Sequence, residues 1–352
     1  MNTQNGHPKR EGGIALLIVL LVVFVFTILA GGFAYNVKIE TTLARNAQDD
    51  YEFEWLGRSG MEFSKWVLGQ QMTIREEPYD SLNQFWAGRK FDTNDVFEGL
   101  SLQNIPIGRG NVTLQFTDVQ SKFNINIANE EVLTRATELI GIDVADAPII
   151  VDSILDWIDR DNTPRDQGVE EDHYLDAESP HRCKNGPLDS LTELLLVNGV
   201  EPEMFWGTDP VDIQSMTRME QFRHRQADLP EYTNSFVKLF TTLGTKLNPN
   251  TCSSDALQLF GLDPEYAETV ISERAGFDGV EGTEDDQPFR SPQDFAGRVG
   301  AGSGQLANLV SVRSAVFRVD ITTSIGERSR QKVAYLFRRN DKDVRILFSY
   351  WE

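Results

Sequence analysis

The longest apolar stretch of the chain lies near its N-terminus. Residues 14–37 read IALLIVLLVVFVFTILAGGFAYNV and include no charged side chain. As an α-helix this segment is roughly 36 Å long, which exceeds the roughly 30 Å hydrocarbon core of a bilayer. The pattern therefore predicts one membrane-spanning helix.

The residues that precede this helix predict its orientation. Lys9 and Arg10 lie beside a single acid, Glu11, whereas the chain after residue 37 is mixed and then acidic. Because basic residues favour the cytoplasmic side of a membrane, we expect a cytoplasmic N-terminus and a bulk on the opposite side. A cleaved signal peptide is the alternative, although its apolar region usually spans only ~7–15 residues. The small residues at positions 30–32 leave such cleavage open.

The helical pattern continues beyond the membrane. No proline occurs between Pro8 and Pro78, so nothing forces the helix to break where it leaves the bilayer. We expect one helix from residue 14 to about residue 70, with an amphipathic outer half that packs against a partner. The alternative is an anchor and a separate helix, with a bend near Gly31 and Gly32. The apolar residues that recur at roughly helical spacing are Leu43, Ala47, Tyr51, Leu56, Met61, Phe63 and Val67.

Alternation of apolar and polar residues predicts strands at two distant places. Residues 111–119 read NVTLQFTDV, and segments 318–322, 332–338 and 344–350 form a later group separated by turn residues. Because a lone strand is marginally stable in water, we expect all four to form one antiparallel sheet. The predicted fold class is α+β, with the long N-terminal helix packed on this small sheet.

The segment between the strands, residues 126–308, has a helical pattern. Asn129 precedes two glutamates, Ser190 and Glu193 form a capping box, and Pro264 and Pro292 stand at first helical positions. We therefore predict a large α-helical domain inserted into the sheet.

Two segments of the insert, FNINIANEEVLTRATELIGID and LDSLTELLLVNGVEP, resemble helix-hairpin-helix modules. In the DNA-binding versions, the hairpin glycines face phosphate beside basic residues. Here Gly141 and Gly199 are followed by acids, so we interpret both segments as packing elements of a helix-hairpin-helix or SAM-like domain.

The charge of the chain also argues against a nucleic-acid partner. Lys and Arg total 33 and Asp and Glu total 54 among 352 residues, so the formal charge is 33 − 54 = −21. A field of this sign repels phosphate backbones.

The acids concentrate in one part of the insert. From residue 143 to residue 178 there are twelve acids and two bases. Such a loop is unstable unless a cation neutralises it, and calcium accepts six to eight oxygen ligands from irregular loops. We therefore predict a calcium site that is not an EF-hand, with a solvated acidic loop as the alternative. The candidate ligands are Asp159, Asp161, Asp166, Gln167, Glu170, Glu171, Asp172 and Asp176, and Gly168 permits a tight turn.

A second acidic loop, residues 276–289, reads GFDGVEGTEDDQPF. Its glycines allow backbone carbonyls to turn inward as ligands. For this loop, the sequence is compatible with either a metal site or a solvated acidic loop. The candidate ligands are Asp278, Glu281, Asp285 and Asp286, with Glu284 beside them.

The sequence does not predict an enzyme. The four histidines stand apart, and HExxH, GxSxG and phosphate-binding motifs do not occur. Carboxylates such as Asp159 and Glu171 leave a membrane-anchored hydrolase as one alternative, and a DNA-uptake receptor built on the hairpin modules is another. Cys183 and Cys252 allow at most one disulfide, and two separate buried thiols are equally compatible with the pattern.

The N-terminal junction resembles that of type IV pilin-like prepilins. A basic leader ends in Gly13 directly before the apolar helix. In that family a prepilin peptidase cuts after the glycine and methylates the new N-terminus, which implies a mature chain that starts at Ile14. Most members carry Glu at the fifth mature position, where this chain has Ile18. K-type minor pseudopilins of the type II secretion system usually lack that Glu.

The insert also resembles the K-type family, known as general secretion pathway protein K. The resemblance rests on SKFNINIANEEVL, VDSILDWIDRDNTPRDQGVEEDHYLD and NGPLDSLTELLLVNGVEPEMF, and it covers nearly the whole chain. It implies calcium in the insert, an inner-membrane anchor and a periplasmic bulk. It also implies a structural role at the tip of the pseudopilus. The partners it implies are the H, I and J types of minor pseudopilin, the prepilin peptidase and the inner-membrane secretion platform.

We therefore divide the chain into four parts. Residues 1–13 are a leader and residues 14–70 form the N-terminal helix. Residues 71–125 and 309–352 form a pilin-like domain, and residues 126–308 form the inserted α-helical domain.

Overall fold

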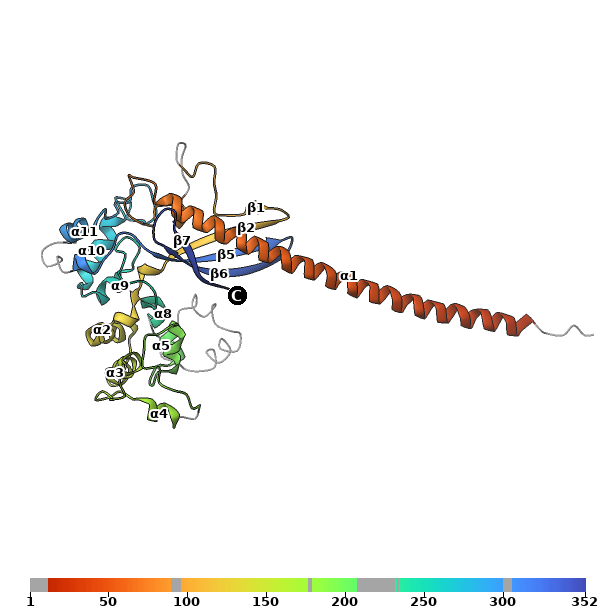
Figure 1. Cartoon of the computed structure of the whole chain (residues 1–352), viewed down its shortest axis with the longest axis horizontal. Coiled ribbons are helices and arrows are strands. Elements are labelled where there is room, and N and C mark those ends of the chain that lie inside the picture. The colour runs from red at the N-terminus through yellow and green to blue at the C-terminus, as the bar shows by residue number, and fades with distance from the viewer. Residues whose placement is uncertain (1–11, 90–95, 177–178, 208–231, 233, 300–305) are drawn as a thin grey trace, which may run out of the picture.

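The computed structural model describes residues 12–89, 96–176, 179–207, 232, 234–299 and 306–352. The first element, α1 (Gly12–Gln71), is one continuous helix (Figure 1). Among the described residues it is the one helix long and apolar enough to cross a membrane. The prediction of an unbroken helix is confirmed, and no separate second helix follows a bend at Gly31 and Gly32. The basic residues Lys9 and Arg10, on which the predicted orientation depends, lie outside the described residues.

One sheet lies against the distal half of α1 (Figure 1). Its described strands run in the order β1-β2-β5-β6-β7, and each pair of neighbours is antiparallel. The four predicted strands are confirmed, whereas β1 was not predicted because it is only three residues long and contains Pro106. The bounds are β1 (Ile105–Ile107), β2 (Gly110–Asp118), β5 (Val316–Ile325), β6 (Arg328–Arg338) and β7 (Val344–Trp351).

Close approach of α1 to the sheet depends on a glycine. A Cβ atom at Gly60 would lie 2.6 Å from Ile321 Cγ2, so the missing side chain lets helix and sheet meet. Around this contact, Val112, Leu114 and Leu56 are buried in a common apolar core. Burial of such side chains supplies most of the free energy that holds α1 on the sheet.

The amphipathic face of α1 is only partly covered. The continuous buried stripe begins at Phe53, which is fully buried. Leu43 and Tyr51, which the pattern also assigned to the packed face, are 61% and 75% exposed. Leu43 precedes the part of α1 that contacts the sheet. The neighbours of Tyr51, Asp50 and Glu52, pair with Arg330 and Arg109, so Tyr51 lies beside the sheet with its own side chain on an uncovered side of α1.

The insert lies between β2 and β5, which are neighbours in the sheet. Its α-helices are short, and a two-residue parallel pair joins β3 (Phe123–Asn124) to β4 (Phe240–Thr241). The described 3₁₀-helices of the chain are η1 (Phe85–Ala87), η2 (Val119–Ser121), η3 (Ile125–Ile127), η4 (Leu191–Leu196) and η5 (Leu306–Asn308). The described α-helices of the insert are α2 (Glu130–Ile140), α3 (Ala147–Ile158), α4 (Glu171–Leu175), α5 (Pro202–Trp206), α8 (Phe236–Leu239), α9 (Ser254–Leu259), α10 (Pro264–Arg274) and α11 (Pro292–Val299).

Local sequence signals explain where these helices begin and end. The Asn129 side chain accepts a hydrogen bond from the amide of Val132 and caps α2, and Gly141 ends this helix in the left-handed conformation. The predicted capping box of Ser190 and Glu193 is present. It begins a 3₁₀-helix rather than an α-helix, and this six-residue 3₁₀-helix is longer than most 3₁₀ segments.

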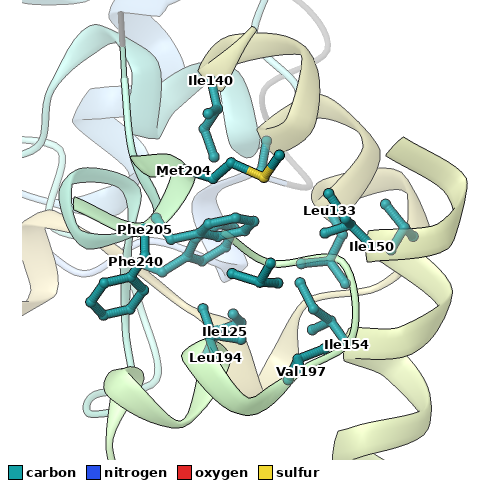
Figure 2. Close-up of a cluster of buried hydrophobic side chains, with 14 of the residues drawn as sticks. Ile125, Leu133, Ile140, Ile150, Ile154, Leu194, Val197, Met204, Phe205 and Phe240 are labelled. Carbon is teal, nitrogen blue, oxygen red and sulfur yellow. The ribbon is translucent and has the colours of Figure 1, made fainter. Parts of the chain in front are cut away.

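The insert contains two apolar cores. Figure 2 shows the first, in which Leu133 and Ile140 of α2, Ile150 of α3 and Phe205 of α5 converge. Ile125, which precedes the predicted start of the insert at residue 126, also packs in this core. The exact start of the insert stays a prediction. A second core gathers Leu247, Cys252, Ala256, Phe289, Phe295 and Val310.

The two cysteines lie in different cores of the insert. Cys183 is buried in the first core and Cys252 in the second, and both thiols are free. The structure therefore favours two separate buried thiols over a disulfide.

Buried polar contacts join the insert to the sheet where the chain leaves β2. The Asp118 carboxylate accepts hydrogen bonds from Asn248 Nδ2 (3.0 Å), Thr251 Oγ1 (2.7 Å) and Ser314 Oγ (2.6 Å). The backbone amide of Gln120 donates to the same carboxylate (2.9 Å). We refer to these five residues as the Asp118 junction. It fastens the entry, the interior and the exit of the insert at one point.

An ion pair extends this junction to α1 and β6. The guanidinium of Arg338 pairs with Asp80 and donates to the carbonyl oxygens of Leu68 (3.3 Å) and Ser314 (2.8 Å). The amide of Ser314 donates to Asp80 (2.8 Å). Both charges are buried, so their pairing and these hydrogen bonds offset the cost of removing them from water.

Asn248→Ala should lower the free energy of unfolding by about 2–3 kcal/mol, because Asp118 loses a buried donor. Urea denaturation of the full chain in detergent, followed by tryptophan fluorescence, measures this change. Asn111→Ala removes an exposed amide from β2 and is the matched control, with an expected change below about 0.5 kcal/mol. Equal effects of the two substitutions would contradict the assigned role of Asn248.

Candidate metal centre

Three of the predicted metal ligands meet beyond the C-terminal end of α3. Oxygen atoms from the carboxylates of Asp159, Asp161 and Glu170 lie within 4.8 Å of one another. Asp159 ends α3, and Glu170 precedes α4, so the loop between these helices closes the group. Among the described residues, this is the group of acids that has the spacing of a metal site.

Glu170 is the buried member of the group. It is 8% exposed, and its carboxylate oxygens meet no hydrogen-bond donor other than the thiol of Cys183, whose weak interaction opposes the rise of its pKa. Burial, together with the negative charges of Asp156, Asp159 and Asp161, raises the pKa of Glu170 from 4.5 to about 7. A cation between these carboxylates would supply the missing partner and favour the ionised form.

Asp156 lies beside this group, and its negative charge helps to raise the pKa of Glu170, although the sequence did not single it out as a ligand. Its side chain is fully buried and burial raises its pKa. One oxygen has no hydrogen bond but lies 3.5 Å from Arg165 Nε in an ion pair. The other oxygen accepts a hydrogen bond from the amide of Arg165 (3.1 Å). The available signal was an acid between Leu155 and Trp157, inside the apolar pattern of a helix. Buried acids of this kind usually have a charged partner.

The loop folds tightly over Asp156. Gly168 faces the Asp156 carboxylate, and a Cβ at this position would collide with it. The amide of Gln167 donates to Asp152 Oδ2 (3.0 Å), which holds the loop on α3. The missing side chain of Gly168 therefore permits a close approach to Asp156, whereas the sequence predicted only a tight turn at this glycine.

The remaining predicted ligands of this loop lie outside the three-acid group. The Gln167 and Asp166 side chains are exposed, as are those of Asp172 and Asp176. Glu171 instead lies 3.6 Å from Arg182 in an ion pair. The structure therefore brings Asp159, Asp161 and Glu170 together and does not place the other predicted residues with them.

In the second acidic loop, residues 276–289, backbone amides of the loop donate hydrogen bonds to the loop's own carboxylates. Asp285 accepts hydrogen bonds from the amides of Phe277 (2.6 Å) and Asp278 (3.0 Å), and hydrogen bonding, first from Thr283, lowers its pKa. Asp286 accepts one from the amide of Gly282 (2.8 Å). Among the described residues of this loop, no three acids lie close enough together to form a metal site by the same distance.

Glu281 of the same loop pairs with the buried Arg274. A metal at Asp278, Glu281, Asp285 and Asp286 stays a prediction.

The first site suits a hard divalent cation. Its donors are carboxylate oxygens, and the described residues bring no histidine into the group. Calcium and magnesium prefer oxygen ligands, and calcium accepts the less regular arrangement that a loop and a helix end provide.

Comparison with known proteins identifies relatives of the whole chain and of its central part. The family model of type II secretion system protein K matches residues 112–211, which include the three-acid group. A type II secretion system protein K of Pseudomonas aeruginosa is 24% identical over 357 residues, with 96% of this chain and 92% of the relative covered. One of Klebsiella pneumoniae is 27% identical over 212 residues, 56% of this chain and 60% of the relative.

A solved structure shares the fold. A chain in the crystal structure of the GspK-GspI-GspJ complex from the enterotoxigenic Escherichia coli type 2 secretion system aligns with a TM-score of 0.58. The alignment covers 88% of this chain and 99% of that chain at 16% sequence identity. The likeness confirms the predicted α+β fold class.

Calcium should stabilise the protein more at pH 8 than at pH 5.5. In the metal-free state the raised pKa of Glu170 makes ionisation destabilise the fold, so this penalty grows as the pH rises from about 4.5 to about 7. Calcium removes the penalty. We expect saturating calcium to raise the Tm by roughly 5 °C at pH 8 and by less than half of this at pH 5.5. Differential scanning calorimetry measures both values.

Glu170→Gln tests the origin of this effect. The variant should have a higher metal-free Tm at pH 8 than the unchanged chain and should lose most of the calcium response. Asp172→Asn, an exposed acid outside the group, is the control and should respond to calcium normally. A calcium response that is equal at both pH values and unchanged in Glu170→Gln would contradict the assignment.

Proposed function

We propose that this chain, which belongs to the type II secretion system protein K family, is the structural minor pseudopilin at the tip of the secretion pseudopilus. The observation that carries this proposal is the joining of three parts in one chain. An apolar helix long enough to cross a membrane packs on an antiparallel sheet, and a helical insert separates two neighbouring strands of that sheet. The proposed role is assembly of the pseudopilus and support of protein export across the outer membrane, without catalysis.

In this proposal, α1 holds the subunit in the membrane before assembly and leaves the membrane during assembly. Its apolar part holds the subunit in the inner membrane with the bulk in the periplasm, since every residue from Leu16 to Leu29 is exposed in the isolated chain. On assembly, contacts with the helices of other subunits replace lipid. Prepilin peptidase cleaves after Gly13 and methylates Ile14, and both residues lie in the first turn of α1.

Two observations support the proposed tip position, the residue at position 18 and the place of the insert. Ile18 has no charge with which to pair the amino terminus of a subunit above it. The helices of the insert lie beyond and beside the end of α1 that is farthest from its N-terminus (Figure 1). In the proposed assembly, a body in this place occupies the space above α1 and faces cargo or the outer-membrane channel.

Other minor pseudopilins of the H, I and J types are the proposed partners. The prepilin peptidase and the inner-membrane secretion platform act on the chain before and during assembly.

Calcium is the proposed structural cofactor. Asp159, Asp161 and Glu170 would hold it, with Asp156 beside them. Its contribution is to neutralise buried carboxylates and thereby fix the loop between α3 and α4.

Gly13→Leu should block maturation, because the peptidase requires the small residue before the cut. Membranes from cells that also express the peptidase should contain only the full-length precursor, as judged by intact mass. Gly31→Leu, a like change inside α1 with open space around it, should be processed normally. Normal processing of Gly13→Leu would contradict the assigned cleavage site.

Antibodies against the insert should label only the ends of pseudopili in electron micrographs. Filaments that also contain the major subunit are the material for this measurement, and an antibody against that subunit is the control, which should label the whole length. Labelling along the filament by the first antibody would contradict the tip position.

A further inference from the structure

The two edges of the sheet differ in how they are protected. β1, at one edge, has three residues and contains a proline. β7, at the other edge, has eight residues and no proline, and its segment from Ile346 to Trp351 has no charged side chain. Soluble proteins usually keep edge strands short or charged, because open edges associate with other chains. β7 therefore departs from the usual protection.

The exposed side chains of β7 form an apolar surface. Ile346, Leu347, Phe348 and Tyr350 are 38%, 46%, 47% and 43% exposed. Leu347 is the extra residue of a β-bulge, since Phe348 pairs with Tyr335 and Ile346 pairs with Leu336. Phe348 and Tyr350 pair with Tyr335 and Val333 and lie on the face of the sheet opposite α1, whereas Ile346 pairs with Leu336 on the face that packs against α1. We refer to Leu347, Phe348 and Tyr350 as the β7 patch.

Charged residues border the patch at its two ends. Arg345 pairs with Asp343 at the start of β7 (2.5 Å), and Glu352 lies 3.7 Å from Arg318 at the other end. Within the patch, the ring of Phe348 stacks on that of Tyr335 with centroids 4.5 Å apart, so the aromatic surface is held in place. An apolar centre with a polar rim is the usual composition of a protein interface.

The position of β7 restricts what can cover the patch. The indole Nε1 of Trp351 donates to Glu54 of α1 (2.9 Å), so the end of β7 is tied to the side of the helix. On the turns of α1 that lead toward the membrane, Tyr51 and Trp55 are 75% and 66% exposed. Trp351 faces α1, whereas Phe348 and Tyr350 lie on the opposite face of the sheet. Because β7 is an edge strand, a partner that covers this edge lies beside α1, where a second chain anchored in the same membrane would also rise.

The charge of the chain disfavours a second copy as this partner. Each copy carries a formal charge of −21, and two such chains repel one another at low ionic strength. A different subunit of lower negative charge meets less repulsion.

We propose that the β7 patch is the docking surface for a different membrane-anchored pilin-like subunit, which covers Leu347 and Tyr350. This inference rests on the proposed function, since it requires that the chain assembles with such subunits. It adds which edge of the sheet makes the contact and which chemistry, an uncharged apolar surface, the partner presents.

Paired lysine substitutions test the patch. The variant Leu347→Lys with Tyr350→Lys places two charges in it at exposed positions that the fold tolerates. The control, Asn111→Lys with Gln115→Lys, adds the same charge at exposed positions of β2 in the same sheet. Full-length chains are coexpressed with the I- and J-type minor pseudopilins of the same secretion system, and the complexes are purified in detergent. Calorimetry of each variant alone verifies that its Tm stays within about 3 °C of the unchanged chain.

We expect the yield of purified complex to fall at least roughly tenfold with the patch variant, relative to the unchanged chain. The yield with the control variant should equal that of the unchanged chain. Equal recovery with both variants would overturn the docking surface while leaving the proposed function intact. Failure of the unchanged chain to recover either subunit would contradict the proposed function, and the docking inference would fall with it.

A photo-crosslinking residue at position 347 identifies the occupant in whole cells, with position 115 as the control. A crosslink from position 347 to the I- or J-type subunit supports the proposal. A crosslink to a second copy of this chain, or to lipid alone, overturns it. Buried Cys183 and Cys252 do not interfere, since the probe is not a thiol reagent.

Discussion

A single buried carboxylate, that of Asp118, holds together the parts of this molecule. The carboxylate ends β2 and meets donors from the insert and from the residues before β5. Burial raises its pKa, and the hydrogen bonds from Ser314 and Thr251 oppose that shift. Because an unpaired carboxylate would be costly at this depth, the two ends of the insert must stay together for the sheet to be stable. The Asp118 junction thus holds the long insert in a fixed position relative to the sheet.

This rigidity gives α1 a mechanical role. Near its C-terminal end the carbonyl oxygen of Leu68 accepts a hydrogen bond from Arg338, which also pairs with Asp80 beside the junction. A continuous path of helix and buried polar contacts therefore runs from the membrane segment to the insert. In the proposed assembly, the insert moves with α1 when this helix leaves the membrane, and a cation at Asp159, Asp161 and Glu170 would stiffen the far part of the same body.

Sequence reasoning predicted features that depend on local pattern. It predicted the unbroken α1, the four longer strands and the caps at Asn129 and Ser190. It missed β1, because three residues with a proline leave no alternation to detect. It placed eight candidate ligands in one loop, but which of them converge depends on how Gly168 lets the loop close on Asp156, and spacing along the chain does not contain that information. The exposure of Tyr51 was likewise unpredictable, because it depends on which side of α1 the sheet covers.

Amide hydrogen exchange of the full chain in detergent tests the central claim, that the insert and the sheet form one body. The amides of Asn248, Ser314 and Ala315 donate to groups on Gln120 or Asp80 at the junction. The account predicts that they exchange as slowly as the amide of Ile321 in the centre of the sheet. Exchange at the rate of exposed loops, while Ile321 stays protected, would show that the insert moves independently and would contradict it.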